Sequence, residues 1–181
     1  MIEGVSRQGN PSFYNLRQTE MEHERIEQKA SELLHKGNFK SPIDIIDFAE
    51  FVGLIITRNN NDLVYFVKSA EQYFLHLNPN GFDLPDYRFD AMCEIGHYVF
   101  NGDVPRSCRN SLHNKLNEVA SHFARAILLP RDYVLNAIRL NRPYEEIMDL
   151  SKVDYETLCE RFSDIGYGGF NGEKIEKNQK I

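Results

Sequence analysis

Residues 87–98, which read YRFDAMCEIGHY, restrict the fold and chemistry of this chain more than any other stretch. Their pattern predicts one amphipathic helix. Cys93 and His97 are four positions apart and therefore lie on one face of that helix, one turn from each other. Glu94 lies beside them. The stretch is one letter away from H-E-x-x-H, the helix that places two imidazoles on a zinc ion and a carboxylate next to the metal-bound water.

The composition is that of a globular protein with one ordinary domain. Of 181 residues, 41% are hydrophobic and 27% are charged. The net charge of −6 argues against nucleic acid as a direct partner, because such binding usually needs a basic surface. No apolar run reaches the roughly 20 residues that cross a membrane, and the first residues lack the apolar core of a secretory signal. The three cysteines form no short-spaced pair, so we expect free thiols and a cytoplasmic location.

Two helices and three strands are predicted before the central helix. The helices cover residues 19–37, capped by Thr19, and residues 41–53, capped by Ser41 with Pro42 in the first turn. Turn-forming residues separate three short β-type runs, which predicts a small antiparallel meander; the runs are residues 54–57, 63–67 and 73–77. Residues 1–19 are polar and aperiodic, and we expect a flexible arm there.

The second half of the chain is predicted to be helical. The expected helices are residues 86–100, 111–129, 132–140, 144–150 and 154–162, the last capped by Asp154. Glycines with many Lys and Glu residues predict a flexible tail at 167–181. Residues 20–166 are therefore expected to form one α+β domain. It would have N-terminal helices, a small antiparallel three-stranded sheet and a helical half that carries the C-E-x-x-H helix.

The helix predicted at 111–129 is the natural source of a third metal ligand. A catalytic zinc site has three protein ligands, and a glutamate third ligand comes from a following helix in H-E-x-x-H enzymes of that kind. Asn117 lies at the edge of this helix's apolar face, with His113 one turn before it and Ser121 one turn after it. Glu118 is rotated by about 100° from Asn117. The apolar face itself consists of Leu116, Val119, Ala120, Phe123 and Ile127.

These two helices resemble the motifs of the ImmA/IrrE family of zinc metallopeptidase-like proteins. That family carries a pattern close to R-F-T-L-A-H-E-L-G-H-Y-L-L-H, and residues 88–101 read R-F-D-A-M-C-E-I-G-H-Y-V-F-N. Its second pattern is E-x-x-A-N-x-F-A-x-x-L-L-M-P, and residues 117–130 read N-E-V-A-S-H-F-A-R-A-I-L-L-P. The likeness extends over about residues 20–166 and implies a zincin-like single domain.

The chain departs from the family at the metal ligands. Cys93 stands where the family has its first His, and Asn117 stands where it has the ligating Glu. Glu94, the family's general base, and His97, its second ligand, are in place. The resemblance thus implies a metal set of Cys93, His97 and Asn117, which would bind zinc more weakly than two His and one Glu. His113 and Glu118 stay open as alternative third ligands.

The resemblance implies two functions of different kinds. We favour a non-catalytic antirepressor-type module that binds a helix-turn-helix repressor, because two of the three ligand positions are changed. The alternative is an active zinc-dependent peptidase that cleaves such a repressor, with Cys93 and His97 as ligands and Glu94 as general base. Either function implies a cytoplasmic protein of transcription regulation or of a mobile element, with a protein partner and neither nucleic acid nor membrane.

No metal role is predicted for the remaining histidines. We expect His122 at the surface or rim of its helix, and His76 to pack across the sheet. Cys108 and Cys159 are expected to be ordinary free thiols.

Overall fold

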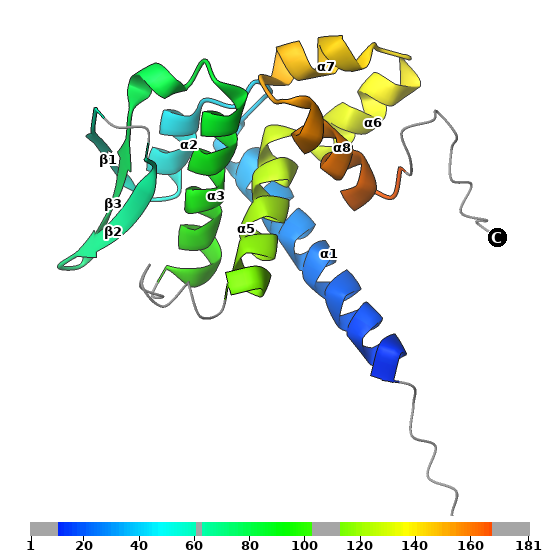
Figure 1. The fold of residues 1–181 in the computed structure, drawn as a ribbon, viewed down its shortest axis with the longest axis horizontal. Helices are drawn as coiled ribbons and strands as arrows, with labels where there is room; N and C mark the ends of the chain where they lie inside the picture. The colour runs from blue at the N-terminus through cyan, green and yellow to red at the C-terminus, as the bar shows by residue number, and fades with distance from the viewer. Residues whose placement is uncertain (1–10, 61–62, 103–112, 168–181) are drawn as a thin grey trace, which may run out of the picture.

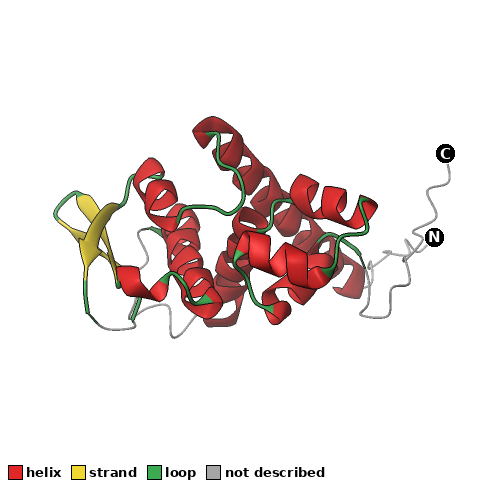
Figure 2. Cartoon of the chain, turned by 90° about the horizontal axis from the view of Figure 1, so that it is seen from above, coloured by secondary structure: helices red, strands yellow, loops and turns green. Residues whose placement is uncertain are grey.

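The structure, a computed structural model, describes residues 11–60, 63–102 and 113–167 (Figure 1). Within these ranges the chain forms seven α-helices, one short 3-10 helix and a three-stranded sheet, which confirms the predicted α+β class. The sheet lies at one end of the molecule and the helices fill the rest (Figure 2). The predictions for residues 1–10 and 168–181 and for Cys108 lie outside the described residues.

The C-terminal part of helix α1 (Pro11–Gly37) packs against α5, and its N-terminal part projects from the domain (Figure 1). Ile26, Ala30 and Leu34 repeat at one-turn spacing and are buried, so one face of the helix belongs to the core. The predicted start at Thr19 was wrong, because the helix already begins at Pro11. Proline suits the first helical position, where its missing N–H has no intrahelical partner to lose.

Helix α2 (Ile45–Phe51) begins later than its sequence suggested. The Asp44 carboxylate caps it and accepts hydrogen bonds from the backbone N–H groups of Ile46 (2.8 Å) and Asp47 (3.0 Å). The predicted cap, Ser41, was wrong, since its hydroxyl lies 3.4 Å from the hydroxyl of Ser151 instead. Serine and aspartate both cap helices well, but the Asp44 carboxylate accepts from two N–H groups that have no partner within the helix.

The sheet is mixed and has the strand order β1-β3-β2. Strand β1 (Ile55–Arg58) pairs parallel with β3 (Gln72–Leu77), and β2 (Tyr65–Ser69) pairs antiparallel with β3. The predicted antiparallel meander was therefore wrong for β1. Leu75 and Leu77 are fully buried, and this most apolar strand takes the centre while the two strands with exposed residues form the edges.

Helices α3 (Pro85–Asn101) and α5 (His113–Leu128) form an antiparallel pair beside the sheet (Figure 1). They approach closely at Gly96, where an added Cβ would lie 3.0 Å from the Phe123 ring and 3.1 Å from the carbonyl oxygen of Ala120. Only glycine permits this spacing without a shift of one helix. Residues on the facing sides of α3 and α5 are thereby brought into contact.

Three shorter helices complete the end of the molecule opposite the sheet: α6 (Arg131–Arg139), α7 (Tyr144–Ser151) and α8 (Tyr155–Asp164). The predicted cap of the last helix is confirmed, because Asp154 accepts a 2.6 Å hydrogen bond from the N–H of Thr157. Across the described part of the chain, no helix has the length and apolar character needed to cross a membrane.

Candidate functional site

Helix α3 presents the C-E-x-x-H residues to two different neighbours. Cys93 faces α5, where its thiol lies 3.9 Å from the hydroxyl of Ser121, within the range of a weak hydrogen bond to sulfur. Glu94 faces the sheet, where its Oε2 accepts a hydrogen bond from the backbone N–H of Phe66 (3.4 Å). His97, one turn beyond Cys93, is buried, with 6% of its surface exposed.

The Glu94 contact identifies β2 as the edge strand that faces α3. Phe66 belongs to this strand, which pairs with β3 on its other side only. Its backbone N–H points away from β3 and toward the helix. The acid of the motif thus lies at the outer edge of the sheet, which β2 forms.

The predicted third position, Asn117, lies on α5 one turn before Ser121. It is exposed and lines a groove between α1, α5 and α8, together with Glu118 and Ser121. Because α3 and α5 run antiparallel, the step from Cys93 to His97 and the step from Ser121 to Asn117 lead toward the same end of the helix pair. The set Cys93, His97 and Asn117 stays a prediction. The side chain of His113, the alternative ligand, lies outside the described part of α5.

The chemistry of the donors does not fit a zinc site of the family's kind. Burial raises the pKa of the Cys93 thiol to about 12, and the hydrogen bond with Ser121 offsets this only in part. Zinc binds cysteine as the thiolate, and the surroundings of Cys93 disfavour the thiolate when no metal is bound. Asn117 is uncharged, and among the described residues no three His, Cys, Asp or Glu side chains form a group that could hold a metal ion.

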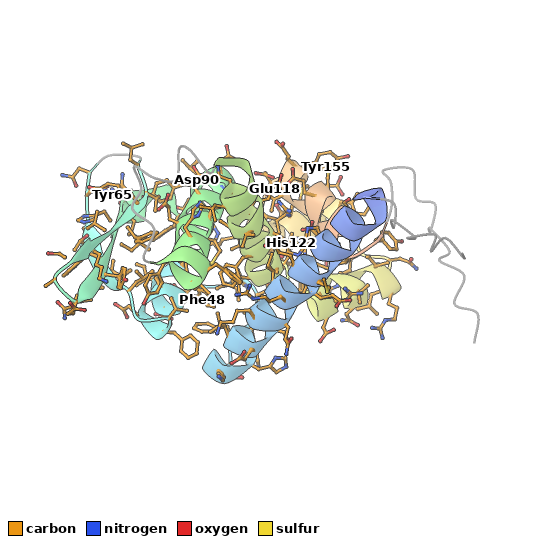
Figure 3. The ribbon with its side chains drawn as sticks, turned by 90° about the horizontal axis from the view of Figure 1, so that it is seen from below. Phe48, Tyr65, Asp90, Glu118, His122 and Tyr155 are labelled. Carbon is orange, nitrogen blue, oxygen red and sulfur yellow. The ribbon has the colours of Figure 1, made fainter. Side chains whose placement is uncertain are left out.

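The adjacent residue on α5, His122, belongs to a different cluster. Only 2% of its surface is exposed, so the prediction that it lies at the surface or rim was wrong. Its Nε2 lies 3.0 Å from Oε1 of Glu27 on α1, and its Nδ1 lies 3.5 Å from Oδ1 of Asp164 on α8. Figure 3 shows His122 beside α1. These partners come from distant parts of the chain, so no local pattern marked the residue.

Two arginines complete this cluster. Arg161 on α8 is fully buried; it donates to both carboxylate oxygens of Glu27 and, through Nε, to the carbonyl of Leu129 (2.8 Å). Arg125 on α5 donates through Nε to Asp164 (2.6 Å) and also binds Glu160 (2.6 Å). The cluster therefore joins α1, α5 and α8 through charged side chains.

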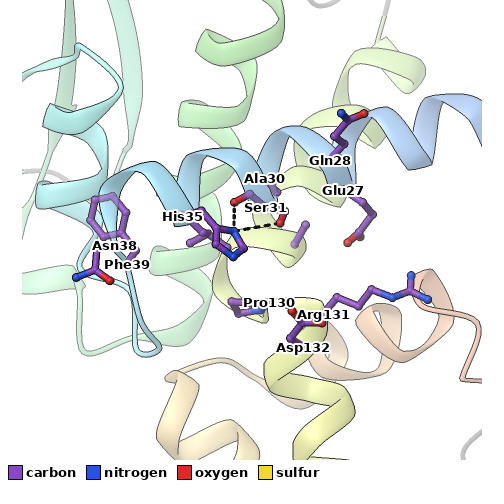
Figure 4. Close-up of a pocket in the computed structure, with 12 residues that line it drawn as sticks. Glu27, Gln28, Ala30, Ser31, His35, Asn38, Phe39, Pro130, Arg131 and Asp132 are labelled. Carbon is purple, nitrogen blue, oxygen red and sulfur yellow. Dashed lines mark hydrogen bonds between the residues drawn. The ribbon is translucent and has the colours of Figure 1, made fainter.

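Two cavities flank α1. The groove that contains Asn117 has a volume of about 680 Å³, and every residue that lines it is polar; they are His23, Asn117, Glu118, Ser121, His122, Arg125, Glu160, Ser163 and Asp164. The other cavity, of about 440 Å³, lies between α1 and the start of α6 and contains none of the predicted site residues (Figure 4). Its histidine, His35, bonds the carbonyl of Ser31 on its own helix (2.8 Å).

The fold and the motif together define a metallopeptidase-like domain. The Peptidase_M78 family model, described as the IrrE N-terminal-like domain, matches residues 54–163, which is more than half of the chain. The chain therefore belongs to this family, as its resemblance to ImmA/IrrE proteins predicted. A comparison with curated proteins finds no match. Helices α1 and α2 lie before the matched segment, although Glu27 of α1 contacts residues within it.

Proposed function

We propose that this protein is a regulatory member of its family that binds a helix-turn-helix repressor without cutting it. The observation that carries the proposal is the state of the first ligand position. Cys93 is a half-buried thiol whose pKa is raised to about 12 by desolvation, and it contacts Ser121. With Asn117 at the third position, the site keeps the family's fold but carries neither the His nor the Glu of the family's first and third ligand positions.

The open edge of β2 is the proposed place of capture. A peptide adds to a sheet edge through backbone hydrogen bonds, and neighbouring side chains supply specificity. The strand and its approach expose two apolar side chains, Leu63 and Val67, at 61% and 38%. Edge strands with exposed apolar residues are prone to pair with another chain.

An active zinc peptidase is the second candidate. It is favoured by one observation: Glu94 and His97 occupy the positions at which the family holds its general base and second ligand, and Glu94 lies at the sheet edge. This function requires that Cys93, His97 and a third side chain bind zinc.

Metal analysis of protein purified without chelator separates the two candidates. We expect far less than one zinc per chain in the parent. A stoichiometric zinc that is lost in both Cys93→Ala and His97→Ala would overturn the proposal in favour of the peptidase. We expect zinc to bind after the double change Cys93→His with Asn117→Glu. The control combines Cys93→His with Asn136→Glu, at an exposed position of α6, and should bind no zinc.

Capture is tested by incubating the full chain with purified helix-turn-helix repressors and separating complexes by size. The proposal expects a complex that contains intact repressor; a clipped repressor would contradict it. Val67 is exposed on β2. Val67→Glu should therefore weaken capture by at least about tenfold, while Val67→Ile should retain it.

A further inference from the structure

In the described part of the chain, helices cover only one face of the sheet. Helices α2 and α3 contact β1 and β2, and the sheet forms the end of the molecule (Figure 2). Side chains alternate between the two faces of a strand, and the face toward the helices carries the buried Phe66, Leu75 and Leu77. We call the opposite face the outer face; it consists of the side chains of Ile55, Thr57, Tyr65, Val67, Ser69, Gln72, Phe74 and His76.

The centre of the outer face is apolar. The strand register places Ile55 and Val67 on either side of Phe74, in one row across the three strands. Ile55 and Val67 expose 39% and 38% of their surface, and Phe74 is half-buried. The side of a sheet that faces only water is ordinarily polar. An exposed apolar row in the middle of this face therefore indicates a contact surface.

The neighbouring row is polar but uncharged. The Thr57 hydroxyl lies 2.7 Å from Nδ1 of His76, and Tyr65 stacks on the same ring with centroids 4.7 Å apart. No Asp, Glu, Lys or Arg belongs to the outer face, although 27% of the chain is charged. Two copies that each carry a net charge of −6 repel one another, and the outer face lets them meet without opposing like charges.

We propose that two copies of this chain pair through their outer faces. Both rows read alike from either side, as aliphatic, Phe, aliphatic and as hydroxyl, His, hydroxyl. A twofold axis along β3 therefore places Phe74 against Phe74 of the second copy and Ile55 against Val67 of the second copy. Thr57 likewise meets Tyr65 of the second copy. Such an axis keeps the strands of the two sheets nearly aligned, as in other face-to-face sheet packings.

The size of the outer face predicts a weak dimer. Strands lie about 4.8 Å apart and rise about 3.4 Å per residue, so the three strands offer a face of roughly 15 by 17 Å. This is well below the surface that each partner of a stable complex buries, and we expect a dissociation constant on the order of 10–100 μM. The contact uses side chains that stand perpendicular to the sheet, whereas strand addition uses backbone groups in its plane. The dimer therefore does not depend on the proposed capture of a repressor.

A dilution series of the full chain tests the dimer. Sedimentation equilibrium between about 1 and 500 μM should show a reversible change from monomer to dimer. A chain that is still monomeric at the highest concentration, or one that forms open-ended aggregates, would overturn the proposal. Amide NMR spectra over the same series locate the contact. Concentration-dependent shifts should lie in β1, β2 and β3, and shifts restricted to another surface would refute the pairing of outer faces.

Three variants test the twofold arrangement. Ile55→Glu should weaken dimerisation by at least about tenfold, because it buries a carboxylate against an apolar side chain. The matched control is Leu140→Glu, which adds the same charge at an exposed apolar position near the opposite end of the molecule and should dimerise like the parent. Adding Val67→Lys to Ile55→Glu should restore the dimer, since the axis places position 55 of one copy against position 67 of the other.

The variants can also contradict the arrangement. Unchanged dimerisation in Ile55→Glu, equal weakening in Leu140→Glu or a double variant that fails to recover would each exclude it. The dilution series of the parent decides the question even if Ile55→Glu does not fold.

Discussion

Two neighbouring residues on α5, Ser121 and His122, face chemically opposite environments. Ser121 meets the neutral thiol of Cys93 at 3.9 Å, between helices packed as closely as a glycine allows. His122 meets carboxylates from α1 and α8, in a cluster with two buried or half-buried arginines. The charged side chains around His122 thus join helices α1, α5 and α8, whereas Ser121 and Cys93 meet through a long neutral contact.

The largest expected effect is the loss of the buried guanidinium. Arg161→Ala should lower the free energy of unfolding by about 3–5 kcal/mol, because it removes the buried guanidinium that binds both carboxylate oxygens of Glu27 and the carbonyl of Leu129. Urea unfolding followed by circular dichroism measures it. Arg142→Ala, which breaks a surface pair with Glu146, is the control and should change stability by less than about 1 kcal/mol. Equal losses of stability in the two variants would show that the buried ion pair stabilises the protein no more than the surface pair does.

Acid should weaken the charged cluster around His122. The pKa of Glu27 is lowered from 4.5 to about 2, so its contribution is complete above pH 4.5 and is lost as the pH falls toward 2. Between pH 6 and pH 3 we expect the free energy of unfolding to fall by at most about 2 kcal/mol from this group. Glu27→Gln should remove most of this loss. Glu32→Gln, at an exposed site on the same helix, should leave it unchanged.

Packing should control the stability of the uncharged contact between α3 and α5. Gly96→Leu places a side chain where even a Cβ lies 3.0 Å from the Phe123 ring, and we expect a loss of about 2 kcal/mol from overpacking. Thermal and urea unfolding both report it. Gln28→Leu adds a similar side chain at an exposed position of α1 and should cost little. A neutral outcome for Gly96→Leu would mean that α3 and α5 separate without penalty.

The smallest expected effect is at Ser121. Ser121→Ala removes a long contact to a thiol and should change the unfolding free energy by no more than about 0.5 kcal/mol. A loss above about 1.5 kcal/mol would show that the Cys93–Ser121 contact stabilises the helix pair in its own right, and the contrast with His122 would then disappear.

Local signals explain which parts of the fold could be predicted. Helix positions and the Asp154 cap follow from periodicity and capping residues that lie within a few positions of each other. The sheet order could not be predicted in this way. The parallel pairing of β1 with β3 joins Ile55 to Phe74, and nothing in either strand specifies that partner. Ser41 and Asp44 are both suitable N-cap residues, and only the tertiary structure shows that Asp44 caps α2.

The sequence by itself determined the identity of the motif residues, because Cys93, Glu94 and His97 are related by the spacing of one helix, and their setting identified the family. Tertiary structure decided what surrounds them. It placed Ser121 against Cys93, the backbone N–H of Phe66 against Glu94, and carboxylates from α1 and α8 around His122. The physical reason is that periodicity is a property of neighbouring residues, whereas burial and charge pairing depend on segments that meet only when the chain folds.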